Sequence, residues 1–171
     1  VDEYLRIHKD ASYKSAAEDL YLETWRQSGD AKKTLEAARK ILAQDDNNVA
    51  ALTVVAESYM ESEADPKKLI AYATRILGVL DLQPAREGPD WPKRKAQLAG
   101  RAQWMIGSAS IQLEKFKDAD KSIRAALPFL RGDGRLTSAA LFYLGWANYR
   151  MGRFSDAIRF NKECTLIKGP F

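Results

Sequence analysis

Apolar side chains recur along almost the whole chain at the spacing of one helical face. Leu52, Val55, Ala56 and Tyr59 follow the i, i+3, i+4, i+7 pattern that is typical of an amphipathic α-helix. Further stretches within residues 69–80, 98–113 and 116–130 follow the same rule. No stretch of useful length alternates apolar and polar residues, as a half-buried β-strand would. The pattern therefore predicts an all-α protein.

Short polar or glycine-containing breaks divide this pattern into segments. Residues that end one helix or cap the next occur at Gly29-Asp30, in the polar run at 45–48 and at Asp65-Pro66. Gly132-Asp133-Gly134 and Gly152-Arg153 form two more turns. We expect helices at about residues 3–28, 31–44, 48–62, 66–80, 92–114, 116–130, 136–151 and 154–167.

Paired in chain order, these helices form four antiparallel hairpins in a single domain spanning residues 1–171. The hairpins fall at about 3–44, 48–80, 92–130 and 136–167. The longest connection, residues 81–91, contains two prolines and a glycine, so it cannot be helical throughout. We interpret it as a loop insertion between hairpins; a hinge between two small domains is the alternative. Because the sequence begins with Val1, we expect it to be part of a longer chain.

One stretch occurs twice, with an offset of 38 residues between 104–119 and 142–157. The matching positions are Gly107/Gly145, Ala109/Ala147, Phe116/Phe154, Asp118/Asp156 and Ala119/Ala157. A helical repeat of this length is typical of a stacked array of helix hairpins. Each hairpin has an apolar face that it cannot bury alone, so neighbouring hairpins must stack.

Both copies resemble the tetratricopeptide repeat (TPR) family. That family pairs a small residue in each of its two helices, with an aromatic residue after the turn, as in Gly145, Ala157 and Phe154. The resemblance is strongest over residues 100–168 and implies a right-handed α-solenoid. It also implies that each glycine lies at a helix crossing beside the alanine of its own copy, and that Phe154 fills the space beside the turn.

By the same resemblance, first-helix positions outside the core line a concave binding groove. In this chain those positions are Arg101, Trp104, Ser108, Ile111, Gln112, Phe142, Trp146, Tyr149 and Arg150. The alternative is that the rings pack against an adjacent hairpin or against residues beyond Phe171, because aromatic stripes at helical spacing often belong to a core. TPR domains that clamp acidic chaperone tails use Lys, Asn and Arg on successive first helices. At the matching positions this chain has Asp19 and Glu23, then Thr53, Val54 and Glu57. Because Asp and Glu would repel a carboxylate, we expect no clamp of this kind.

Composition narrows the function further. The chain is 46% hydrophobic and 29% charged, as in soluble globular domains, and no apolar run is long enough to insert into a membrane. Residues 1–85 carry 11 Lys and Arg against 15 Asp and Glu, a net charge of −4, whereas residues 86–171 carry 16 against 8, a net charge of +8. This asymmetry is compatible with an acidic partner for the second half.

No catalytic constellation stands out. His8 is the only histidine and Cys164 the only cysteine, so a conventional zinc site has too few ligands and we expect no metal or other cofactor. Cys164 is best explained as a small buried hydrophobe, and the carboxylate pairs Asp19/Glu23 and Glu57/Glu61 as solvated helix faces.

We therefore predict a non-enzymatic scaffold that binds a protein or peptide segment with apolar anchors and some acidic character. A nucleic-acid-binding helical repeat and an accessory domain of an enzyme are the alternatives; the first is disfavoured because no base-reading residue recurs at one position. The sequence leaves the oligomeric state open, and the compartment open between the cytoplasm and export after loss of a signal peptide.

Overall fold

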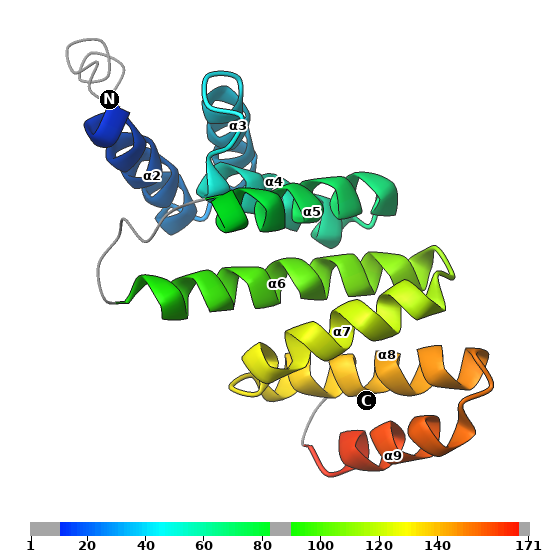
Figure 1. Ribbon diagram of the computed structural model, residues 1–171. Helices are drawn as coiled ribbons and strands as arrows, with labels where there is room; N and C mark the ends of the chain where they lie inside the picture. Colours follow the sequence, from blue (N-terminus) through cyan, green and yellow to red (C-terminus); the bar gives the residue numbers. More distant parts are fainter. Residues whose placement is uncertain (1–10, 83–89, 168–171) are drawn as a thin grey trace.

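The computed structural model describes residues 11–82 and 90–167, and within them it is entirely helical (Figure 1). The helices are α2 (Ala11–Gln27), α3 (Ala31–Leu42), α4 (Val49–Ser62), α5 (Pro66–Leu82), α6 (Trp91–Gln112), α7 (Phe116–Leu130), α8 (Gly134–Arg150) and α9 (Phe154–Thr165). His8, the first part of the first expected helix and most of the expected loop insertion lie outside the described residues. The all-α prediction is confirmed.

The helix starts follow from capping side chains that the sequence had marked. Asp30 Oδ1 accepts a hydrogen bond from the Lys33 backbone N–H at 3.0 Å, which caps α3. Asn48 Oδ1 accepts from the Ala51 N–H at 2.9 Å and caps α4. Each bond satisfies a backbone donor that the first helical turn leaves free.

Most helix boundaries differ from the expected ones by one or two residues, and three of these differences concern the connections between hairpins. Asp133 accepts from two backbone N–H groups of the following turn, so α8 begins at Gly134, ahead of the expected residue 136. Helix α5 continues to Leu82 and α6 begins at Trp91, so both ends of the expected loop at 81–91 are helical. Asp90 with Pro92 at the second helical position allows α6 to begin there.

The helices stack in chain order into an α-solenoid, with the long α6 in the middle of the stack (Figure 1). The first helices of neighbouring hairpins contact each other: α2 contacts α4, α4 contacts α6, and α6 contacts α8. In the described parts of the chain, the second helices α3, α5, α7 and α9 make no comparable contact with one another. The stack therefore curves toward the layer of first helices, which we call the inner layer.

The core consists of three successive apolar clusters. The first joins α2, α3 and α4 around Leu22 and Ile41. The second joins α4, α5 and α6 around Leu69 and Met105. The third joins α6, α7, α8 and α9 around Ile123. Because each cluster shares helices with the next, burial is continuous along the stack, as the repeat pattern requires.

Gly107 and Gly145 lie at helix crossings, as predicted, but their nearest neighbours differ from the predicted alanines. A Cβ placed on Gly107 would collide with Ile123, and one placed on Gly145 would collide with the Asn161 side chain. These neighbours lie one turn beyond Ala119 and Ala157. Helical side chains lean toward the helix N-terminus, so a residue one turn farther along reaches the crossing.

Cys164 is buried, as predicted. Its Sγ lies 3.3 Å from the Ser138 carbonyl oxygen, to which the thiol donates. Burial raises the pKa of the thiol, which keeps it protonated and unreactive at neutral pH. None of the described helices has the length and apolar composition needed to cross a membrane.

Candidate functional site

Helix α8 has one buried face and one exposed aromatic face. Leu144 and Asn148 are fully buried. Phe142, Trp146 and Tyr149 remain 39%, 41% and 56% exposed. Their i, i+4, i+7 spacing places these rings on one side of the helix, so the aromatic face is a property of α8 itself.

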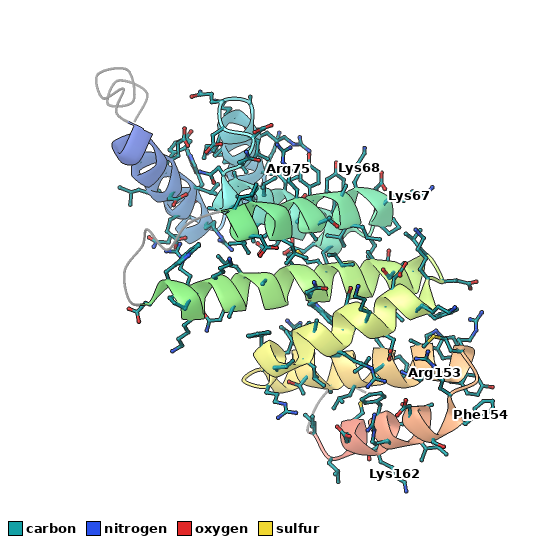
Figure 2. All side chains as sticks on the ribbon, viewed as in Figure 1. Lys67, Lys68, Arg75, Arg153, Phe154 and Lys162 are labelled. Carbon is teal, nitrogen blue, oxygen red and sulfur yellow. The ribbon has the colours of Figure 1, made fainter. Side chains whose placement is uncertain are left out.

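The exposed rings touch one another and continue onto α9. Trp146 stacks on Tyr149 with centroids 6.2 Å apart, and Tyr149 meets the edge of Phe154 at 5.9 Å. Phe154, which is 59% exposed, lies at the turn that joins α8 and α9 (Figure 2). We call Phe142, Trp146, Tyr149 and Phe154 the aromatic surface.

The exposure of Phe154 corrects one expectation from the repeat. The equivalent Phe116 is half-buried because the Arg150 guanidinium of the next hairpin lies 4.6 Å from its ring centroid. No helix follows α9 within the described residues, so Phe154 has no such cover. It adds to the exposed aromatic area and does not fill a space in the core.

Arg150 lies at the edge of the aromatic surface between two rings. Its guanidinium carbon is 4.6 Å from the Phe116 centroid and 5.5 Å from the Trp146 centroid. Its charged partner is Glu114, at 3.8 Å from Nη2 to Oε2. Cation–π contacts of this kind hold a guanidinium plane in place while its N–H edges stay available.

Trp104, predicted to line the groove, is buried and only 7% exposed. Its ring stacks on Tyr143, with centroids 5.8 Å apart and planes 15° apart. Trp104 and Phe142 are equivalent in the repeat, and within the described residues a following hairpin covers Trp104 but not Phe142. Trp104 therefore packs α6 against α8. Burial, and next the negative charge of Glu63, raise the pKa of the Tyr143 hydroxyl.

The other residues predicted on α6 do not join the aromatic surface. Arg101 is exposed and forms an ion pair with Glu57 at 2.6 Å. Ser108 is half-buried, and its hydroxyl donates to the Met105 carbonyl oxygen at 3.1 Å. Ile111 packs against the third core cluster, whereas Gln112 is exposed. The predicted residues Phe142, Trp146, Tyr149 and Arg150 thus lie together on α8, whereas Trp104 is buried against Tyr143, which in turn contacts Phe142.

Glu57 makes a connection that the sequence did not predict. Its carboxylate lies 2.6 Å from Arg101 on α6 and 3.2 Å from Arg26 on α2, so ion pairs join three helices of the inner layer. The expectation of a freely solvated carboxylate is wrong for Glu57, whose side chain is only 15% exposed. A cavity of about 520 Å³ adjoins it, lined also by Lys32, Val54 and Glu61. Charged side chains of both signs line it.

No group of three or more His, Cys, Asp or Glu side chains gathers in the described residues as a metal site would require. What the site offers chemically is therefore contact area from rings and donors from arginine. That combination suits recognition of another molecule.

No protein-family model matches the sequence, and no curated protein matches it. Solved structures of MamA, a TPR-like helical protein, are similar in fold. One crystal structure of MamA has a TM-score of 0.61 at 20% identity, over 86% of this chain and 74% of that one. The MSR-1 C2 structure of MamA has a TM-score of 0.59 at 12% identity, over 94% and 80%. At such identities the likeness shows the fold alone.

Proposed function

We propose that this chain is a non-enzymatic scaffold that binds a peptide or protein segment along its inner layer of helices. The observation that carries the proposal is the exposure of three neighbouring rings on α8, Phe142, Trp146 and Tyr149. Clustered exposed aromatic rings usually mark an interaction site. Trp, Tyr and Arg are also the residues that contribute most to binding at protein interfaces.

The fold supports this proposal because the helix that carries the rings is rigidly packed against the core. The opposite face of α8 is locked into the third core cluster through Leu141, Leu144 and Ala147. Tyr143 of α8 also stacks on Trp104 of α6, which fixes α8 against the neighbouring hairpin. Binding to a rigid surface loses less conformational entropy than binding to a loop. The curved solenoid, similar in fold to MamA, offers an extended inner face of the kind that repeat proteins use for partners.

A photo-crosslinking experiment can identify the partner segment. We would replace Tyr149 with benzoylphenylalanine in one protein and Phe129 in another. Both side chains are exposed, but Phe129 lies on α7, away from the aromatic surface. We expect Tyr149→benzoylphenylalanine, and not the control, to capture a defined protein segment. Capture of nucleic acid would instead support the alternative function.

The captured segment, synthesised as a peptide, then tests Trp146 directly. We expect Trp146→Ala to weaken binding by about 2 kcal/mol or more, which is about 30-fold, because it removes a central aromatic anchor. The melting temperature should stay close to that of the wild type, since Trp146 is not a core residue. Unchanged affinity in calorimetric titration would contradict the proposed site. A large loss of melting temperature would show that Trp146 serves the fold.

A further inference from the structure

Resting on the proposed function, we infer that Arg150 selects an acidic partner segment, and that Glu114 occupies Arg150 until a carboxylate of the partner replaces it. The Glu114 carboxylate and the partner carboxylate would thus compete for the same Arg150 guanidinium. The occupant to which we commit is a protein segment with an Asp or Glu side chain next to a large apolar side chain.

Arg150 is positioned before any partner arrives. Phe116 and Trp146 flank its guanidinium at 4.6 and 5.5 Å, which restricts the long side chain to one orientation. Within residues 11–82 and 90–167, no hydrogen bond to its N–H groups is formed, and its charged contact is the 3.8 Å pair with Glu114. A planar, oriented guanidinium with free donors favours a carboxylate that it can bind through two parallel hydrogen bonds.

The Glu114 pair is weak enough to be displaced. The Glu114 side chain is 70% exposed, and exposed pairs of this kind contribute little, because water solvates both charges well. When the partner packs an apolar side chain on Trp146 or Tyr149, that side chain excludes water from the neighbouring Arg150. The partner carboxylate bound there would be less hydrated than Glu114. Its hydrogen bonds to Arg150 would therefore be stronger than the contact that they replace.

The turn after α6 fixes where the Glu114 carboxylate lies. Glu114 has a φ of 55°, in the left-handed region, whereas the equivalent residue in the next copy is Gly152 with a φ of 72°. Glycine adopts this conformation without strain, but glutamate does so at a cost. Glu63 ends α4 in the same conformation, so the left-handed residue belongs to the helix end, and what is particular to Glu114 is its ion pair with Arg150.

Charge complementarity also favours an acidic occupant. Residues 86–171, which contain the aromatic surface, carry a net charge of +8. Lys115 and Arg153, the residues that precede α7 and α9, are exposed and lie next to the two turns beside the surface. An acidic segment would approach this end of the molecule faster and bind it more tightly than a neutral one.

A displayed library of short random peptides tests the inference on the whole chain. We expect selected peptides to carry Asp or Glu beside an aromatic or large aliphatic residue. One such peptide is then synthesised in its acidic form and in its amide form, with Gln for Glu and Asn for Asp. Wild-type protein should bind the acidic form about tenfold more tightly, because a charge-assisted, bidentate bond is lost in the amide form.

Two variants separate selection from competition. Arg150→Gln should weaken the acidic form about tenfold and leave the amide form nearly unchanged. Glu114→Gln should strengthen the acidic form by about two- to fivefold, the range expected for removing an exposed competing pair. Because Gln keeps a Cβ, this change leaves the backbone strain in place. Arg150→Lys checks folding and should restore only part of the preference.

Arg159→Gln is the matched control, because Arg159 also lies over a ring, Phe160, at 4.8 Å and pairs with Asp156 at 2.8 Å. It should leave both peptide affinities unchanged. Three results would overturn the inference while the proposed function stands: selected peptides that are apolar without acidic residues, equal weakening of both forms by Arg150→Gln, or no effect of Glu114→Gln. If no peptide is enriched, the proposed function fails and the inference fails with it.

Discussion

Gly107 and Gly145 occupy the same position in two copies of the repeat, yet we expect their replacement by alanine to change stability in opposite directions. In an α-helix, Gly→Ala gains about 1 kcal/mol from helix propensity. At both positions the added methyl group would meet a side chain of the partner helix, Ile123 or Asn161. The difference lies in whether that neighbour can move.

At Gly107 the neighbour is fixed. Ile123 is fully buried, and its backbone nitrogen would also lie 3.2 Å from the new Cβ. Forcing a methyl group into such a crossing costs about 1–3 kcal/mol, so Gly107→Ala should destabilise the protein by up to about 2 kcal/mol after the propensity gain. At Gly145 the obstacle is the end of the Asn161 side chain, which is exposed and can rotate into water. Gly145→Ala should therefore be neutral or stabilising by up to about 1 kcal/mol.

Gly78→Ala is the calibration for this comparison. Gly78 lies inside α5, is exposed, and has no atom within 4 Å of a hypothetical Cβ, so its replacement reports the propensity gain alone. Urea unfolding followed by circular dichroism gives all three free energies of unfolding. The reasoning is refuted if Gly107→Ala and Gly145→Ala shift the free energy equally relative to Gly78→Ala. That result would mean that the two crossings relax to the same degree.

Two further predictions concern strain and pH. Glu114→Gly should stabilise the fold by about 1 kcal/mol, because glycine removes the left-handed strain, whereas Gly152→Ala should destabilise it by a similar amount. Urea unfolding measures both changes in the free energy of unfolding. A loss of stability in Glu114→Gly would contradict the strain. For Tyr143 the pKa is raised in the folded state from 10.0, so its contribution to stability is complete below pH 10 and is lost as the pH rises through the folded-state value. Tyr143→Phe should flatten the alkaline fall in melting temperature, and Glu63→Gln should lower the pKa of the Tyr143 hydroxyl in an ultraviolet titration.

The helices and their starts could be predicted because the forces that set them are local. Asp30 and Asn48 each accept a hydrogen bond from the backbone N–H three residues ahead, and such contacts can be inferred from spacing alone. The resemblance to TPR hairpins likewise predicted that both glycines lie at helix crossings. Their actual neighbours, Ile123 and Asn161, lie one turn from the predicted ones, because side-chain lean is a three-dimensional property.

Burial at the end of the stack could not be predicted from the repeat. Trp104 and Phe142 are equivalent, as are Phe116 and Phe154, yet in the part of the chain that the structure describes a following hairpin covers the earlier member of each pair and not the later one. Tyr143 stacks on Trp104, and Arg150 lies on Phe116. Which member of a pair is exposed depends on whether another helix follows in space, and helical periodicity does not contain that information.

The ion pairs that join Arg26, Glu57 and Arg101 give the solenoid a mechanical property. They link α2, α4 and α6 along the inner layer, which is the side that lengthens when the curved stack is straightened. The Glu57 carboxylate then acts as a tether between two neighbours, and unbending must stretch both contacts. Salt screens the exposed arginines, so the part of the solenoid from α2 to α6 should resist straightening more in dilute buffer than in concentrated salt.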